Sequence, residues 1–350
     1  MKSTQSEWRS IVAKYQVPSV KESLWQVINS FVPFLGLWAV MLYSLNYNYL
    51  LTLLLALPTA GFLIRIFIIQ HDCGHGSFFS SRRANDWLGS LCGVLTLTPY
   101  FSWRKSHSIH HATAGNLEER GPQDIFTLTV DEYLQRSAWD RLKYRLYRNP
   151  ITLFIILPTL LFVVLYRFAA SGTKAGKRER LSVHGTNLAL VAILIAMSLT
   201  IGLKAFLLVH LPVTLLAMTA GTWLFFVQHQ FEDAYWADQE QWDYQLAAMQ
   251  GSSYYKLPKV LQWFTGNIGF HHIHHLSPRI PNYKLAQCHR ENELFQDVIQ
   301  LTLRSSLGTM FLSLWDENQK KLISFRQLKA VQQRKTLVST GIVNQDYLQS

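Results

Sequence analysis

Three short histidine clusters are the most chemically distinctive feature of this sequence. They read His71-Asp-Cys-Gly-His75, His107-Ser-Ile-His110-His111 and His271-His272-Ile-His274-His275, and they place eight of the 13 histidines at ligand-type spacings. Residues three or four apart share one face of a helix, with about 5–6 Å between their Cβ atoms. Each cluster is therefore expected to direct its imidazoles at one point, and neutral imidazole is the commonest protein metal ligand.

A single pair of this kind would carry little weight, because two helical histidines four residues apart often just share a solvated face. Three clusters in one chain of 350 residues argue against coincidence. The isolated His184, His210 and His289 are interpreted differently. A lone histidine near an apolar segment is more often a hydrogen-bonded structural residue than a ligand.

The number of histidines predicts more than one metal ion. A zinc site is complete with about four protein ligands, or with three and a water, and the clusters offer twice that number. Imidazole suits Zn, Cu, Fe and Ni, so the residue types do not choose among these metals. Haem needs only one or two axial ligands and would leave most of the clusters unused.

Long apolar runs must position the clusters, since 49% of the residues are hydrophobic. A membrane-spanning helix needs about 20 mainly apolar residues. The sequence before residue 27 is polar and has no small-residue cleavage site, so we expect the first span to be an uncleaved anchor. The chain is predicted to be an all-α integral membrane protein with four transmembrane helices, at about residues 27–43, 49–69, 188–203 and 205–227.

Two further apolar stretches, 87–100 and 151–168, are ambiguous. If the clusters form one site, an even number of crossings must separate each pair of them. Segment 87–100 therefore cannot cross alone, and only two of the three apolar segments between His111 and His271 can span. We interpret 151–168 as interfacial or re-entrant, because Pro158 interrupts it and basic residues, which stay cytoplasmic, come directly after it: Lys174, Lys177, Arg178 and Arg180.

The distribution of Lys and Arg also orients the chain. The amino-terminal segment and residues 71–186 are rich in basic residues, whereas the connections near 44–48 and 201–204 carry almost none. Basic loops remain in the cytoplasm. Residues 71–186 and 229–350 are therefore expected to form a cytoplasmic helical cap that holds the histidine-rich di-metal site, within a single membrane domain over residues 1–350.

This topology explains most of the net charge of +11. A surface that attracts anionic lipid headgroups or an acidic electron carrier is a secondary hypothesis. We expect no nucleic-acid partner.

The sequences around the clusters resemble the three histidine boxes of the integral-membrane fatty acid desaturases. The resemblance spans about residues 65 to 285 and includes Trp103-Arg-Lys-Ser-His107 and the run His275-Leu-Ser-Pro-Arg-Ile-Pro-Asn-Tyr283. It is closest to the bacterial acyl-lipid desaturases of the delta-5 and delta-12 (omega-6) type. Their second box continues, as here, through Asn116-Leu-Glu-Glu-Arg-Gly121 to Asp124-Ile125 and Thr129-Val-Asp-Glu-Tyr133.

The resemblance implies a di-iron centre and assigns its ligands. His229, in Val227-Gln-His229-Gln-Phe-Glu232, resembles a further ligand at the end of the last span, whereas His272 falls at a variable position and receives no ligand role. Asp72, Asp124 and Glu232 are candidate hydrogen-bond acceptors for the imidazoles, and a role as plain solvated acids is equally open. The implied ligands are His71, His75, His107, His110, His111, His229, His271, His274 and His275.

The implied reaction explains why such a centre is needed. An unactivated methylene has no acidic proton and no leaving group, so only an oxidant formed from O₂ at a redox metal can remove hydrogen there. The resemblance implies that the acyl chain of a membrane phospholipid gains a cis double bond while O₂ is reduced to water. Because the sequence contains no Rossmann, flavin, ferredoxin or cytochrome b5 motif, a separate small electron donor is implied, ferredoxin or flavodoxin in a bacterial plasma membrane.

Two alternatives remain open from the sequence. Hydroxylases and ketolases share the same scaffold and differ only in the step after the first hydrogen abstraction. A histidine-rich metal transporter would carry its ionisable ligands within the spans, near the membrane midplane. Here the histidines lie at or beyond the ends of the apolar segments.

Overall fold

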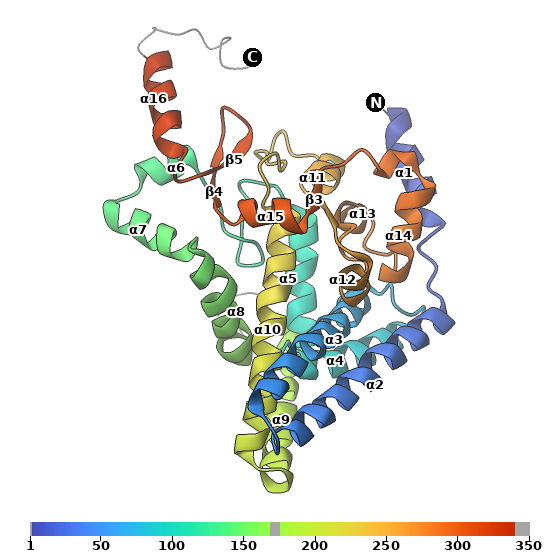
Figure 1. The fold of residues 1–350 in the computed structure, drawn as a ribbon. Helices are drawn as coiled ribbons and strands as arrows, with labels where there is room; N and C mark the ends of the chain where they lie inside the picture. Colours follow the sequence, from blue (N-terminus) through green and yellow to red (C-terminus); the bar gives the residue numbers. More distant parts are fainter. Residues whose placement is uncertain (1, 169–175, 340–350) are drawn as a thin grey trace.

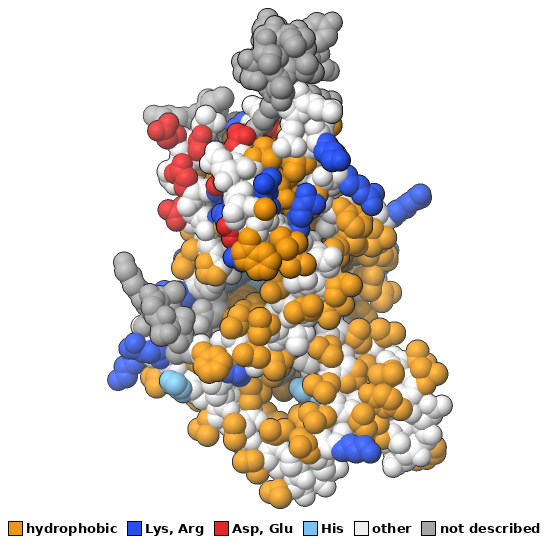
Figure 2. Space-filling view, turned by 90° about the vertical axis from the view of Figure 1, so that its left-hand side faces the viewer, with side chains coloured by type: hydrophobic (Ala, Val, Ile, Leu, Met, Phe, Trp, Pro, Cys, Tyr) orange, Lys and Arg blue, Asp and Glu red, His pale blue; other side chains and the backbone are white. Residues whose placement is uncertain are grey.

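The computed structural model describes residues 2–168 and 176–339, so Lys174 of the basic run lies outside the described residues. Long helices occupy one end of the molecule, and shorter helices and strands form a cap at the other end (Figure 1). Hydrophobic side chains cover most of the helical end, whereas acidic side chains gather on the cap (Figure 2). This division is the one expected of a membrane protein with a polar cap.

Four of the described helices are long and apolar enough to cross a membrane: α2 (Val20–Ser44), α3 (Tyr49–His75), α9 (Lys177–Thr200) and α10 (Leu203–His229). The predicted fold class is thereby confirmed, as a mainly helical protein with four candidate spans. The third candidate span, α9, ends at Thr200, three residues before the predicted end at residue 203. Gly202 takes a positive φ of 85° in the turn before α10, and this turn ends the helix.

Local sequence signals set the ends of the first two spans. The side chains of Ser19 and Asn48 accept hydrogen bonds from the backbone N–H groups of Glu22 and Leu50, and so cap the starts of α2 and α3. Helix α3 ends at His75, because the next residue, Gly76, takes a φ of 71° that glycine adopts without strain. Because the helix ends there, His71 and His75 lie in its last turns.

The segment predicted to be interfacial or re-entrant forms a bent helix. It runs through π-helical turns η1 (Thr152–Ile156) and η2 (Leu160–Val164), joined by α8 (Leu157–Thr159) and followed by a 3₁₀ turn, η3 (Leu165–Arg167). Together with α7 (Ala138–Tyr147) it forms a pair bent by 61°, a shape that fits either a broken span or a re-entrant loop.

Short elements build the cap around the inner ends of α3, α5 and α10 (Figure 1). Its five described strands were not predicted from the sequence. In one sheet, β1 (Leu128–Thr129) pairs in parallel with β4 (Leu312–Asp316), and β4 pairs antiparallel with β5 (Lys321–Ser324). In the other, β2 (Tyr254–Lys256) pairs in parallel with β3 (Gln300–Thr302). The remaining helices are α1 (Lys2–Ala13), α4 (Arg82–Leu95), α5 (Tyr100–Thr113), α6 (Val130–Gln135), α11 (Tyr244–Gln250), α12 (Lys259–Phe264), α13 (His271–Leu276), α14 (Asn282–Glu291), η4 (Glu293–Phe295), α15 (Leu303–Thr309) and α16 (Leu328–Ser339).

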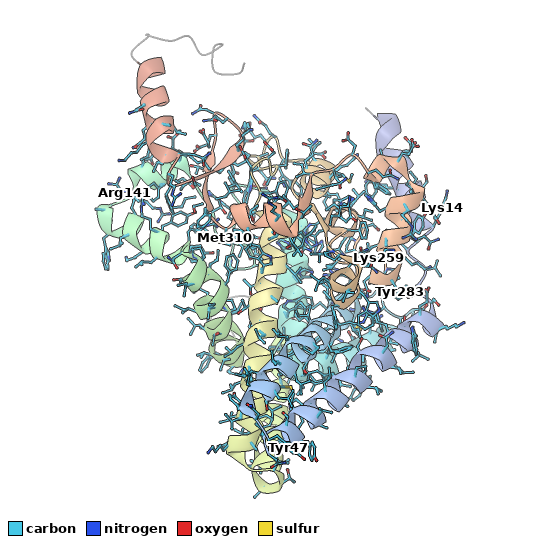
Figure 3. The ribbon with its side chains drawn as sticks, in the orientation of Figure 1. Lys14, Tyr47, Arg141, Lys259, Tyr283 and Met310 are labelled. Atoms are coloured by element: carbon cyan, nitrogen blue, oxygen red, sulfur yellow. The ribbon has the colours of Figure 1, made fainter. Side chains whose placement is uncertain are left out.

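The cap is fastened to the spans by buried contacts. The guanidinium of Arg65 in α3 lies 4.0 Å from the centre of the Trp263 ring in α12 and donates a hydrogen bond to the Trp263 carbonyl. Helix α1 packs through Trp8 into a core that it shares with Ile68 of α3 and Ile273 of α13. In Figure 3, Lys14, Lys259 and Tyr283 lie on the cap side, whereas Tyr47 lies in the turn at the opposite end.

Candidate metal centre

Four helices deliver the candidate ligands to one place. The end of α3 carries His71 and His75, α5 carries the second cluster, His229 is the last residue of α10, and α13 carries the third cluster. The structure brings all nine candidates together in two groups, within each of which the ligand atoms lie within 4.8 Å of one another. The five-histidine group is His71, His75, His107, His111 and His274, and the four-histidine group is His110, His229, His271 and His275.

This division corrects the expectation that each cluster aims at a single point. His107 and His111 belong to the five-histidine group, but His110 between them belongs to the other. Residues four apart are offset by about 40° around a helix, whereas positions i+3 and i+4 differ by about 100°. The i, i+4 pairs therefore share a group, and the i+3 histidine of the second and third clusters points into the neighbouring group.

The ring nitrogens within each group are close enough to share one ion. In the five-histidine group, the Nε2 atom of His111 lies 3.1 Å from the Nε2 atoms of both His107 and His274. In the four-histidine group, the Nε2 atom of His229 lies 3.1 Å from that of His110 and 2.9 Å from that of His271. Two nitrogens bound at right angles to one ion, each at about 2.1 Å, are separated by about 3.0 Å.

The two groups adjoin each other. The rings of His111 and His275, one from each group, stack with centroids 4.1 Å apart and planes 20° apart. Nearly all of these side chains are shielded from solvent, although His75 and His107 are only partly buried. Two adjacent metal ions held by nine imidazoles fit this arrangement.

Hydrogen bonds to the second ring nitrogen fix which tautomer faces the centre. The Nδ1–H of His110 donates to the Asp124 carboxylate at 2.5 Å, and the Nδ1–H of His229 donates to the Gly251 carbonyl at 3.3 Å. Both imidazoles then present an unprotonated Nε2. Two lone pairs facing each other at 3.1 Å repel unless a cation lies between them, and this is the strongest sign that the residues fit a metal.

A carboxylate supports the five-histidine group in the same way. His71 Nδ1 lies 3.1 Å from the Asp72 carboxylate, whose other oxygen accepts hydrogen bonds from the backbone N–H and the side-chain amide of Asn282. The Nε2 atom of His71 is buried without any hydrogen-bond partner, as are those of His75 and His275. These unpaired nitrogens are also available to a metal.

Glu232 does not join the centre. Helix α10 ends at His229, and the chain turns so that Glu232 is exposed, with its carboxylate 3.6 Å from the Lys321 ammonium. Of the three candidate acceptors, Asp72 and Asp124 contact candidate ligands, whereas Glu232 is a solvated acid.

The remaining histidines lie outside both groups. His272 is buried and turned away, and its Nε2–H donates to the Phe295 carbonyl at 3.0 Å. Burial lowers the pKa of His272 to about 3. His184 is exposed, His210 stacks on Phe206 within α10, and His289 packs near Phe270.

Two supporting residues were missed by the sequence analysis. Asn282 holds the Asp72 carboxylate, and Trp103 stacks on the His107 ring with centroids 4.6 Å apart. Gly74 allows this approach, because a Cβ there would lie 3.0 Å from the Trp103 ring. Both Asn282 and Trp103 lie in the quoted box sequences, but no spacing rule marks an amide or an indole as a partner of a distant histidine.

Protonation should destabilise the metal-free centre. Burial, reinforced by neighbouring imidazoles, lowers the pKa of five ligand candidates well below 6.5: His107, His111, His271, His274 and His275. In the unfolded chain these histidines keep a pKa near 6.5, so the unfolded state takes up protons first as the pH falls and is favoured by them. The free energy of unfolding is therefore highest above about pH 6.5 and decreases below it, by up to about 1.4 kcal/mol per pH unit for each histidine.

Thermal unfolding of the metal-free protein in detergent will check this pH dependence. We expect the unfolding temperature to fall steeply between about pH 7 and pH 5, the range in which an ordinary histidine titrates. An unfolding temperature that stays constant over this range would contradict the neutral, buried state of the imidazoles.

Comparison with known sequences places this centre in a family. The sequence model of the fatty acid desaturase family matches residues 44–298, which include all nine candidate ligands. The chain belongs to the fatty acid desaturase family. It is 50% identical over 327 residues to a fatty acid desaturase of Bacillus subtilis (strain 168), covering 93% of this chain and 92% of that protein.

More distant relatives match a smaller share of this desaturase. The chain is 26% identical to the sn-1 acyl-lipid omega-3 desaturase (ferredoxin) of Synechocystis sp., with 63% of this chain and 62% of that protein covered. It is 29% identical to the temperature-sensitive sn-2 acyl-lipid omega-3 desaturase (ferredoxin), chloroplastic, of Arabidopsis thaliana, with 63% and 52% covered. The family is confirmed, but these relatives do not support the expected delta-5 or delta-12 subtype.

Proposed function

We propose that this desaturase uses O₂ and two iron ions to introduce a cis double bond into a lipid-linked acyl chain. The observation that carries the proposal is the pair of adjoining histidine groups, in which imidazole nitrogens converge at about 3 Å. The five-histidine group would hold one iron and the four-histidine group the other. A redox metal pair supplies the oxidising chemistry with O₂ that an unactivated methylene requires.

The chain's own residues prepare this chemistry. Asp72, Asp124 and the Gly251 carbonyl each engage a histidine Nδ1 and leave Nε2 free to bind metal. Burial lowers the pKa of the five imidazoles of α5 and α13 named above, and so favours the neutral form that metal binding requires. Trp103, itself packed edge-on against Phe67, covers the ring of His107 and restricts its motion.

The position of the site favours a membrane lipid as substrate. Helices α3 and α10 end at His75 and His229, so the centre lies at the end of two candidate spans, where an acyl chain can reach it from the bilayer. Two relatives carry acyl-lipid and ferredoxin in their names. We propose a phospholipid acyl chain as substrate and a ferredoxin or flavodoxin as donor.

We further propose that the whole chain forms one domain in a bacterial plasma membrane, with its cap in the cytoplasm. Basic residues are concentrated in the cap-side segments, which the positive-inside rule places in the cytoplasm. In this arrangement, the segment 152–167 does not cross the membrane. A fifth crossing would place the histidine-bearing ends of α3 and α10 on opposite sides of the membrane.

Topology reporters will test this orientation. Fusions at Asn46 and Gly202, in the two turns opposite the cap, should report from outside the cytoplasm, and a fusion at Gly115 should report from inside. The expected result rests on the two helical hairpins, α2–α3 and α9–α10. A cytoplasmic signal at Gly202 would contradict it.

Lipid analysis will test the reaction. Expression in a host that lacks its own desaturases should produce monounsaturated fatty acids in the phospholipid fraction, with the double-bond position located by mass spectrometry. A His107→Ala variant expressed at the same level is the matched control and should produce none. Hydroxylated acyl chains in place of alkenes would favour the hydroxylase alternative.

A further inference from the structure

One arginine is buried without a countercharge beside the last turns of α10. Arg148 directly follows α7 and is only 3% exposed, and its guanidinium lies 5.6 Å from the centre of the Phe226 ring. Within the described residues it forms no ion pair with a carboxylate. Burying an unpaired guanidinium costs free energy that an apolar side chain of the same length would avoid. Such a residue is expected to hold groups together that an apolar side chain could not.

The hydrogen bonds of Arg148 join three separate segments of the chain. Its Nη2 atom donates to the side-chain oxygen of Gln230 at 2.9 Å and to the Leu312 carbonyl, in β4, at 2.6 Å. Its Nη1 atom lies 3.4 Å from the Phe126 carbonyl and 3.5 Å from the Thr127 hydroxyl oxygen. The rigid, planar fork of a guanidinium suits acceptors that lie in several directions, whereas the ammonium of lysine is a single point of charge.

Two of these segments support the four-histidine group. Gln230 comes directly after His229, which is the last residue of α10. Thr127 lies three residues after Asp124, whose carboxylate accepts the Nδ1–H of His110. The Thr127 hydroxyl also donates to the side-chain oxygen of Gln230, at 3.2 Å. The residue next to one candidate ligand and the segment behind another therefore meet at Arg148.

The five-histidine group has other supports. Asp72 contacts His71, and Trp103 stacks on His107. Neither is among the residues to which Arg148 is hydrogen-bonded. Loss of Arg148 should therefore disturb one group and spare the other, whereas a general loss of stability would affect both.

We infer that Arg148 is a positioning residue for the metal ion of the four-histidine group. It acts through Gln230 on His229, and through the segment 126–127 on the carboxylate that orients His110. The inference rests on the proposed function, from which it takes the two metal ions. It adds a residue, more distant than the hydrogen-bond acceptors of the imidazoles, on which only one of the two ions depends.

Titration of the metal-free protein with cobalt(II) in detergent will test this role without requiring turnover, since cobalt(II) bound to imidazole absorbs visible light. Wild-type protein should bind about two ions per chain. Arg148→Met should bind one ion with unchanged affinity and the other about tenfold more weakly, since residues behind metal ligands typically contribute about 10–100-fold to affinity. The ion that stays tightly bound should give the spectrum of His229→Ala, in which only the five-histidine group is complete.

A second buried arginine provides the matched control. Arg167 is half-buried, and its guanidinium donates to the side-chain oxygen of Asn187 and to the Leu97 carbonyl, neither of which adjoins a candidate ligand in the sequence. Arg167→Met should leave both affinities unchanged. Arg148→Lys keeps the charge and a donor, and should recover part of the affinity that Arg148→Met loses.

Gln230→Met decides the question if Arg148→Met does not fold. It removes the acceptor next to His229 but leaves Arg148 bonded to the Leu312 carbonyl, so the same ion should be weakened. Wild-type affinities for both ions in either folded variant would overturn the inference, as would an equal weakening of both ions. A protein that makes no unsaturated lipid but shows the selective loss would refute the proposed reaction and leave the role of Arg148 in place.

Discussion

Replacing His107 with Ala should abolish formation of the unsaturated product. The Nε2 atom of His107 lies 3.1 Å from that of His111, and its ring stacks on Trp103. If His107 is a ligand, as we propose, the variant removes a positioned imidazole that no neighbouring residue replaces. Activity should fall by more than about 100-fold, since loss of a hydrogen-bond partner behind a ligand already costs about 10–100-fold. The same result is expected for His71, His75, His110, His111, His271, His274 and His275.

Two other histidines provide matched controls for this series. His184 is exposed and His289 lies outside both groups, so their replacement by Ala should preserve most of the activity. His272→Ala should give an intermediate result, because it removes the hydrogen bond from His272 to the Phe295 carbonyl, at a cost of about 0.5–1.5 kcal/mol in stability. A His289→Ala protein as inactive as His107→Ala at equal expression would show that the ligand set is wrong.

Sequence alone predicted the parts of the centre that depend on helix geometry and hydrophobicity. The i, i+4 pairs His71/His75, His107/His111 and His271/His275 do share a group, as one helix face requires. The four candidate spans were visible as apolar runs, because a bilayer demands a fixed length of apolar helix.

The sequence could not predict how the nine histidines are divided between the two groups. The assignment of His110 and His274 to opposite groups depends on how α5 and α13 face each other across the centre, and no local pattern records that angle. Glu232 failed as a candidate for a related reason. Its distance of three residues from His229 implies a shared face only if the helix continues, and α10 ends at His229.

The four-histidine group should be the more sensitive of the two to the loss of one ligand. His229→Ala leaves three imidazoles in that group, whereas His71→Ala leaves four in the other. We therefore expect His229→Ala to lower the iron content from about two ions per chain towards one and to remove most activity, while the protein remains inserted, because the loss of a ligand to one ion leaves the five-histidine group intact. Metal analysis of the purified protein measures this directly.

A glutamine at the same position separates a ligand from a structural residue. The Nδ1–H of His229 donates to the Gly251 carbonyl at 3.3 Å, and the amide of glutamine can make a comparable hydrogen bond. Glutamine is a poor ligand for iron, however, and cannot replace the Nε2 atom that lies within 3.1 Å of His110. His229→Gln should therefore resemble His229→Ala in iron content and activity. An active His229→Gln protein with its full complement of iron would remove His229 from the ligands, and only three imidazoles would remain to hold the second ion.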